Sequence, residues 1–182
     1  MKRRKLLKTF VAAATLPAGS LAASGKLALT GKDVEGPFYP VQELPMTASL
    51  LLSEKALGDP LQFSGRILDT QGNALNALRI DIWQCNAMQA YNHPADNGTQ
   101  DPSFRGFAAQ LTDANGAFTF DTIVPVSYGG RPPHIHVKIW QNKTELLTTQ
   151  VYLEGHRGSK KRKINPVKIA DNSYRASFDF VV

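Results

Sequence analysis

The chain has 182 residues, 42% of them hydrophobic, which is enough for one globular domain with a buried core. Its formal net charge of +6 arises near the N-terminus, where positions 2–8 carry five basic residues and no acidic residue precedes Asp33. From residue 23 onward, 16 basic residues are balanced by 15 acidic ones, so the body of the chain is nearly neutral and is not expected to bind nucleic acid.

Residues 1–22 have the composition of a targeting segment. A basic start is followed by a short apolar stretch, Phe10–Leu16, and by small residues that end at Ala22. The paired arginines of Arg3–Lys8, followed by two leucines, fit a twin-arginine signal; an ordinary secretory signal and a disordered basic tail are the alternatives. We therefore expect export by the twin-arginine machinery to the periplasm or the cell exterior. The apolar stretch is too short to cross a membrane, and no later segment is apolar enough.

Residues 23–60 are expected to form an irregular N-terminal segment. Within it, Glu35–Pro40 is rich in glycine and proline and is typical of a rigid turn, whereas Met46–Leu57 is compatible with a short helix.

Residues 61–182 are predicted to form a single β-sandwich domain. Short alternating segments are separated by turns rich in Gly, Asn and Asp, a pattern typical of an all-β, antiparallel sandwich with irregular loops and little helix. The expected strands are Leu61–Leu68, Ala77–Gln84, Phe107–Leu111, Ala117–Phe120, His134–Trp140, Glu145–Tyr152 and Tyr174–Val181.

Two features of this domain are expected to have no part in catalysis or ligand binding. Cys85 is the only cysteine, so no internal disulfide can form, and its apolar surroundings in the sequence indicate a buried, unreactive thiol. The basic run Lys160–Lys163 is expected to be a solvated loop rather than a phosphate-binding patch.

The segment Arg131–His136 carries the most informative chemistry. In a strand, His134 and His136 point to the same face while Ile135 points to the other, with the two Cβ atoms about 7 Å apart. Both rings can then reach one metal, although imidazole alone does not select the metal, and a plain polar strand face is the alternative. The phenols of Tyr128 and Tyr91 would add hard oxygen donors, which favour a hard cation such as ferric iron.

Several segments, taken in order, resemble the intradiol ring-cleavage dioxygenases, the catechol and protocatechuate 3,4-dioxygenase family. The resemblance runs from Asp33 to about Gly155 and indicates a small exported member of that family. Its fold is a β-sandwich of transthyretin-like architecture, in agreement with the strand pattern. The matching segments are Glu35–Tyr39, Gly65–Asp69, Ile82–Gln84, Asp101–Phe107, Thr112–Gly116, Arg131–His136 and Thr149–Tyr152.

The resemblance implies a mononuclear, non-haem Fe(III) site, with one iron per chain. Carried over by position, Tyr91 and Tyr128 match the family's two tyrosine ligands, and His134 and His136 match its histidine pair. Four residues match positions around the reacting ring, one of them the ligand Tyr128. Arg131 would stabilise negative charge on it, Tyr128 would leave the metal when substrate binds, and Gln150 would line the site, with Tyr152 as a further lining residue.

The implied reaction inserts both atoms of O2 into a catechol-type diol and gives a cis,cis-muconate-type diacid. The expected partners are thus a small catechol-type substrate and O2, while the oligomeric state is left open. A catalytically inactive, transthyretin-like binding module is the alternative function. A zinc hydrolase built on the histidine pair is disfavoured, because no third ligand or general base stands at a diagnostic spacing.

The sequence departs from the family pattern at three places near the expected site. Gln89 and Val126 stand where the family commonly has glycine, each two residues before one of the tyrosines. The segment between Tyr128 and Arg131 is also short, which predicts a more open or differently walled pocket.

Overall fold

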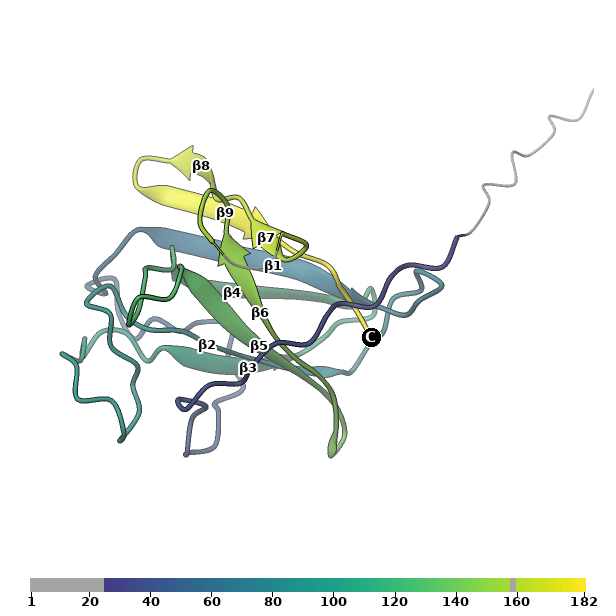
Figure 1. Cartoon of the computed structure of the whole chain (residues 1–182), viewed down its shortest axis with the longest axis horizontal. Helices are drawn as coiled ribbons and strands as arrows, with labels where there is room; N and C mark the ends of the chain where they lie inside the picture. The colour runs from purple at the N-terminus through teal and green to yellow at the C-terminus, as the bar shows by residue number, and fades with distance from the viewer. Residues whose placement is uncertain (1–24, 158–159) are drawn as a thin grey trace, which may run out of the picture.

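The computed structural model describes residues 25–157 and 160–182, and the expected signal segment 1–22 lies outside them. The described part is all-β, as predicted (Figure 1). Its strands are β1 (Pro60–Leu68), β2 (Arg79–Trp83), β3 (Phe107–Leu111), β4 (Ala117–Ile123), β5 (His134–Gln141), β6 (Thr144–Leu153), β7 (Lys163–Ile164), β8 (Val167–Ala170), β9 (Ser173–Ser177) and β10 (Phe180–Val181). In this part of the chain we find no helix long and apolar enough to cross a bilayer.

The strands form two sheets that pack face to face. One sheet has the order β10-β1-β9-β8, with β4 paired along β1, and the other has the order β3-β2-β5-β6-β7. Most neighbours are antiparallel, as expected, but β1 runs parallel to β9 and β10, and β6 runs parallel to β7. The predicted sandwich is therefore confirmed, and each of its sheets is mixed.

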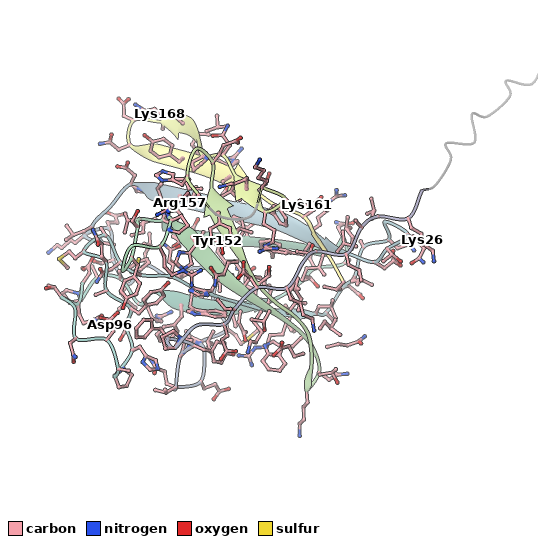
Figure 2. The ribbon with its side chains drawn as sticks, viewed as in Figure 1. Lys26, Asp96, Tyr152, Arg157, Lys161 and Lys168 are labelled. Atoms are coloured by element: carbon pink, nitrogen blue, oxygen red, sulfur yellow. The ribbon has the colours of Figure 1, made fainter. Side chains whose placement is uncertain are left out.

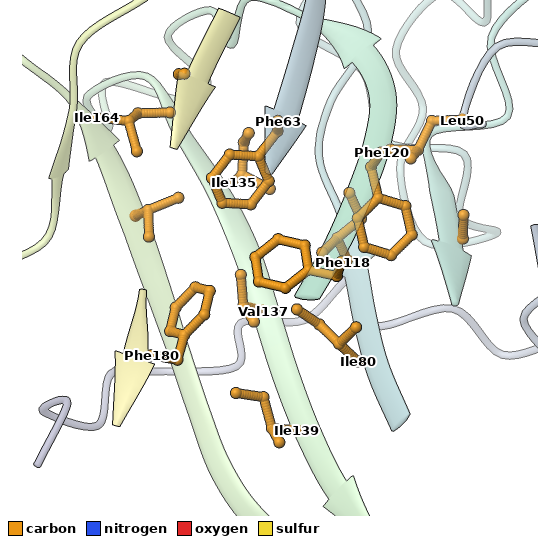
Figure 3. Close-up of a cluster of buried hydrophobic side chains, with 14 of the residues drawn as sticks. Leu50, Phe63, Ile80, Phe118, Phe120, Ile135, Val137, Ile139, Ile164 and Phe180 are labelled. Carbon is orange, nitrogen blue, oxygen red and sulfur yellow. The ribbon is translucent and has the colours of Figure 1, made fainter. Parts of the chain in front are cut away.

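The core lies between the two sheets and follows from the two-residue period of the strands. Along β5, the side chains of Ile135, Val137 and Ile139 are fully buried against the opposite sheet. Phe63 of β1 and Phe120 of β4 meet them from the other side (Figure 3). One face of β5 is thereby committed to the core, and its other face remains available for function.

The expected helix at Met46–Leu57 is wrong. This segment instead links β3 and β4, strands of different sheets, through isolated bridges from Met46 to Ala109 and from Ser49 to Asp121, and then turns at residues 54–55. The Leu50 amide donates to the Asp121 carbonyl at 2.9 Å, a hydrogen bond to a residue far along the chain. Bonds of this kind replace the local bonds of a helix, so tertiary pairing overrides the local pattern.

Each predicted strand overlaps an observed one, but the C-terminal part of the chain is more divided than expected. The predicted strand Tyr174–Val181 is split into β9 and β10, which pair with successive parts of β1. The strands β7 and β8 were not predicted. Both are short, and β8 has four exposed residues, so neither produces a clear alternation in the sequence.

The irregular segment at residues 25–46, here called the N-terminal arm, crosses the outer face of the second sheet (Figure 1). Its backbone is fixed at Asp33, whose amide donates to the Thr148 carbonyl at 3.0 Å. Two side chains of β6 reach back to it, since Thr149 donates to the Gly31 carbonyl at 2.7 Å and Gln150 donates to the Val34 carbonyl at 2.6 Å. The arm therefore covers the face of β5 and β6 that the core does not use.

We expect Phe120→Ala to lower the free energy of unfolding by about 3–5 kcal/mol, because it leaves a cavity in a fully buried cluster. Urea denaturation followed by circular dichroism measures this loss. Leu111→Ala is the control, since Leu111 is 57% exposed at the end of β3 and its replacement should change stability by less than about 0.5 kcal/mol. Similar losses in the two variants would contradict the assigned core.

Candidate active site

Three polar atoms converge on the outer face of β5. The Nε2 atoms of His134 and His136 lie 3.0 Å apart, and the Tyr91 hydroxyl lies 3.1 Å from the first and 3.0 Å from the second. All three residues are buried. The structure thus brings together both histidines and one of the two tyrosines that the sequence singled out.

The strand register places a supporting row of side chains on the same face. Trp83 of β2 pairs with His136, and His136 pairs with Gln150 of β6. The Trp83 indole stacks on the His136 imidazole, with ring centroids 4.7 Å apart and planes inclined by 10°. This stacking fixes the orientation of the His136 ring, which a precise ligand geometry requires.

Hydrogen bonding determines the tautomer of His134, and so shows which ring nitrogen has a free lone pair. Its Nδ1 lies 2.7 Å from the Pro132 carbonyl, which can only accept, so Nδ1 carries the proton and Nε2 is free to bind a cation. Burial, then the neighbouring His134 and then the positive charge of Arg131 lower the pKa of His136 well below its usual value. Burial lowers the pKa of His134 as well. Both rings are therefore neutral at physiological pH, which is the form that binds metals.

Tyr91 is held by the polar loop that follows β2. The Asp96 carboxylate accepts a hydrogen bond from the Tyr91 amide at 2.9 Å, and the Gln100 side chain donates to the Tyr91 carbonyl at 2.9 Å. Burial raises the pKa of the Tyr91 phenol far above its usual value. Ionisation of this phenol would therefore require a strong positive charge next to it.

Gln89 stands where the family commonly has glycine, and its backbone adopts a conformation that glycine favours. Its φ of 65° lies in the left-handed region, which favours glycine. The Asn86 side chain accepts hydrogen bonds from the Met88 and Ala90 amides, at 2.9 and 3.0 Å, on either side of Gln89. The turn thus keeps the conformation that a glycine would adopt, and the substitution does not displace Tyr91 from the cluster.

The convergent atoms fit a metal ion. Imidazole nitrogens bind transition ions such as zinc at about 2.0–2.1 Å, so neighbouring ligands of one ion lie about 3 Å apart, as these three atoms do. The other ring nitrogen of His136, Nδ1, is buried without a hydrogen-bond partner in the described residues, so stacking on Trp83 orients this ring. No cluster of three or more His, Cys, Asp or Glu side chains occurs in residues 25–157 and 160–182. The third donor here is thus a phenol, a hard oxygen ligand.

Tyr128 lies beside this cluster rather than within it. Its ring meets that of Tyr91 edge to face, with centroids 5.0 Å apart, and meets Phe38 in the same way at 5.5 Å. Burial and the neighbouring Asp96 carboxylate raise the pKa of its phenol. The structure therefore places the Tyr128 ring beside that of Tyr91, at the edge of the convergent atoms.

A tight turn accounts for the short segment between Tyr128 and Arg131. The Arg131 amide donates to the Tyr128 carbonyl at 2.7 Å, and the reverse bond measures 3.3 Å. Gly129 and Gly130 have φ values of 51° and 76°, the conformation of a two-residue hairpin turn. Both side chains that flank this turn consequently reach the same cavity.

Arg131 is oriented by a chain of buried polar groups. Its guanidinium donates to the Gln150 side-chain oxygen at 2.7 Å and lies 3.5 Å from the Tyr152 hydroxyl. Tyr152 in turn donates to the Asp33 carboxylate at 2.8 Å. The structure thus brings Arg131, Gln150 and Tyr152 together in one hydrogen-bonded chain.

Asp33 and Arg162 complete this chain and were not singled out from the sequence. Arg162 forms an ion pair with Asp33, and its Nε donates to the Gln150 carbonyl at 2.9 Å. The expectation of a solvated loop at Lys160–Lys163 is therefore wrong for Arg162, whose side chain is only 11% exposed. Arg162 directly precedes β7, and this two-residue strand is too short to show an alternation that would have revealed the inward position of Arg162.

The site opens into a small cavity of about 230 Å3. This volume is below the range of about 300–1,000 Å3 typical of sites for drug-sized ligands, so it suits a single small ring. The cavity combines apolar walls with the polar groups described above, and its lining residues are Gly36, Pro37, Phe38, Tyr91, Tyr128, Arg131, His134 and His136.

The fold and the site define a β-sandwich protein with a candidate metal site of mixed histidine and tyrosine donors. The model of the Dioxygenase family matches residues 34–132, a span that includes Tyr91, Tyr128 and Arg131 and ends just before His134. The chain belongs to the intradiol dioxygenase family.

Similar proteins agree with this assignment. The protocatechuate 3,4-dioxygenase beta chain of Burkholderia cepacia is 30% identical over 139 residues, covering 68% of this chain and 59% of its own. Catechol 1,2-dioxygenase of Candida albicans is 26% identical over 143 residues, covering 68% of this chain and 46% of its own. The chain thus spans about half the length of these relatives.

A solved structure covers more of the chain. The dioxygenase domain of a dioxygenase carbohydrate-binding protein fusion from Streptomyces sp. SirexAA-E superposes with a TM-score of 0.74 and 30% identity, over 85% of this chain and 98% of its own. An intradiol ring-cleavage dioxygenase from Tetranychus urticae, 20% identical, shares the fold with a TM-score of 0.70, over 85% of this chain and 94% of its own.

Replacement of Asp33 by Asn should destabilise the protein by about 1–3 kcal/mol at pH 7, because it leaves the buried Arg162 guanidinium without its counter-charge. Burial acts to raise the pKa of Asp33, but hydrogen bonds from the Val34 amide and Tyr152, together with Arg162, hold it below its usual value. A lowered folded-state pKa stabilises the fold above the unfolded pKa of about 3.9 and ceases to do so as the pH falls through the folded value.

The difference in unfolding free energy between wild type and Asp33→Asn should therefore be constant from about pH 7 to 5 and shrink below about pH 4. Urea titrations across this range measure it. Glu54→Gln, on an exposed turn, is the control and should show no comparable difference. A wild-type advantage that persists undiminished at pH 3 would contradict the role given to the Asp33 carboxylate.

Proposed function

We propose that the protein is an intradiol ring-cleaving dioxygenase that inserts both atoms of O2 into a catechol-type diol and releases a cis,cis-muconate-type diacid. The observation that carries this proposal is the convergence of the Tyr91 hydroxyl with the Nε2 atoms of His134 and His136 at a ring-sized cavity. A binding module without catalysis has no need of such a donor set.

The proposed cofactor is one non-haem Fe(III), held by Tyr91, Tyr128, His134 and His136. When bound, ferric iron would stabilise the phenolates and draw electron density from the diol, which makes the ring reactive toward O2. The histidines contribute neutral lone pairs, and Trp83 keeps the His136 ring in place. Tyr91, the more deeply buried phenol, is suited to be the permanent anionic ligand.

Tyr128 is the ligand proposed to exchange during the reaction. It is only partly buried and rests on apolar ring edges, so its position is less constrained than that of Tyr91. Its phenolate would accept a proton from one diol hydroxyl as the substrate enters.

Arg131 is proposed to stabilise the negative charge that develops on the ring. Its guanidinium is a rigid, positively charged donor that Gln150 orients in advance, so no reorganisation is needed when the charge appears. Pro37 and Phe38 supply the apolar wall that holds the ring and excludes water. The residues around the cavity thus divide into metal-binding, charge-stabilising and ring-holding groups.

We also propose that the protein is exported, on the basis of the twin-arginine pattern in Arg3–Lys8. Replacement of Arg3 and Arg4 by lysine together should leave the precursor inside the cell, as judged by cell fractionation and immunoblotting. A double variant that is processed and exported like wild type would exclude this route.

The first test of the ferric site is a visible spectrum of the purified protein, with its iron quantified. We expect about one iron per chain and a broad tyrosinate-to-iron absorption band that shifts when catechol is added without oxygen. Removal of the iron by a chelator should abolish both the band and the formation of muconate from catechol. A protein that remains colourless after iron reconstitution would refute the proposal.

Two variants assign the ligands. His134→Ala should weaken iron binding by more than the 10–100-fold typical of outer-shell changes, while circular dichroism shows an intact sandwich. Tyr128→Phe should keep iron but alter the band and slow turnover. His93→Ala is the matched control, since His93 lies outside the convergent atoms and should leave iron content and colour unchanged. A Tyr128→Phe protein with wild-type colour and rate would exclude Tyr128 as a ligand.

A further inference from the structure

A second cavity adjoins the ring-sized one at Arg131. It has a volume of about 330 Å3 and is lined by Ser127, Gly130, Arg131, Pro132, Gly155, His156 and Arg157. Because Arg131 lines both cavities, the second one, here called the side cleft, lies directly beyond the rim of the first. The glycine turn forms that rim, and a Cβ atom placed on Gly129 or Gly130 would meet no atom within 4 Å. The rim is therefore low and leaves a passage for a ring substituent.

The far wall of the side cleft consists of Gly155, His156 and Arg157, which follow β6. The Lys163 ammonium donates to the carbonyls of His156 and Arg157, the latter at 3.3 Å, and lies 3.5 Å from that of Leu153. Next to these, the Glu154 amide donates to the Ile164 carbonyl at 2.9 Å. These bonds hold the backbone that presents Arg157 over the cleft, so its binding surface is organised in advance.

The side cleft is positively charged and contains hydrogen-bond donors. Arg131 and Arg157 are its charged lining residues, and Ser127 and His156 add a hydroxyl and an imidazole; none of the lining side chains is a carboxylate. Arg162 is committed to Asp33, but Arg157 forms no ion pair within residues 25–157 and 160–182. Figure 2 shows Arg157 on the same side of the molecule as Tyr152, whose hydroxyl lies 3.5 Å from Arg131. A free guanidinium therefore remains for an anion.

We propose that the substrate is a catechol whose ring carries a short side chain ending in a carboxylate, and that this carboxylate binds Arg157 in the side cleft. The inference rests on the proposed function, because the diol must occupy the ring-sized cavity. The small volume of that cavity requires a substituent to leave it, and the low glycine rim directs the substituent toward Arg157. Arg157 then determines substrate specificity, and Arg131 remains available to stabilise negative charge on the ring.

A matched pair of substrates tests this assignment. With the iron-loaded protein, kcat/KM for 3,4-dihydroxycinnamate should exceed that for its methyl ester by about tenfold, as expected for a charge-assisted hydrogen bond. The advantage should fall as salt is added, because the charged group lies near solvent. Arg157→Gln should remove the preference for the acid and leave kcat/KM for unsubstituted catechol unchanged. Arg157→Lys should retain part of the preference, because it keeps the charge.

Lys160→Gln is the control, since Lys160 is an exposed cation of the same loop that does not line the side cleft. Equal kcat/KM for the acid and the ester in wild type, or a preference that survives in Arg157→Gln, would overturn the proposed subsite even when catechol is cleaved. Failure to cleave catechol at all would instead reject the proposed function. In that case, calorimetric titration of the two compounds without oxygen still decides the subsite: equal affinities in wild type and Arg157→Gln would reject it.

Discussion

The strict alternation of β5 is the constraint on which the rest of the structure depends. Ile135, Val137 and Ile139 are drawn into the core by burial of their apolar surface, which fixes the rotation of the strand about its axis. The two histidines alternate with these core residues along the strand, so their side chains must point to the opposite face. A shift of one residue in register would turn the imidazoles into the core and the isoleucines outward. The packing of the sandwich and the geometry of the candidate metal site are therefore set by the same hydrophobic interaction.

The outer face created in this way is unusually polar for buried surface, and its side chains are satisfied by partners from distant parts of the chain. Lys138 of β5 pairs with Glu35 of the N-terminal arm and with Glu145 of β6. Asp81 of β2 is fully buried, and its carboxylate accepts hydrogen bonds from Tyr39, Arg79 and Trp140. Buried charges without such partners would cost several kcal/mol each. The arm thus belongs to the same electrostatic unit as the site that it covers.

Local sequence pattern was sufficient for the longer strands and for the histidine pair, because both depend on alternation within a few residues, but it did not reveal the short strands β7 and β8. The convergence of Tyr91 with the histidines could be expected only through the family resemblance, since a tyrosine in a polar loop has no diagnostic spacing. Asp33 and Arg162 could not be found by either route. They lie 129 positions apart, and their pairing is decided by the parallel contact of β7 with β6 and by the path of the arm. The helix predicted at Met46–Leu57 was wrong for the same reason, since the main hydrogen-bond partners of this segment are remote in sequence.

The arm contributes no residue to the main core cluster, whose first member along the chain is Leu50. Its own apolar contacts are confined to the smaller cluster around Trp83, to which it supplies Phe38, Tyr39 and Leu44. Detachment of the arm would accordingly leave the sandwich folded while it uncovers the imidazoles of β5. We therefore expect hydrogen exchange to show the arm opening at a lower free energy than the strands of the sandwich. The lifetime of the closed site is then governed by the attachment of one peripheral segment, and the melting temperature of the domain is no guide to it.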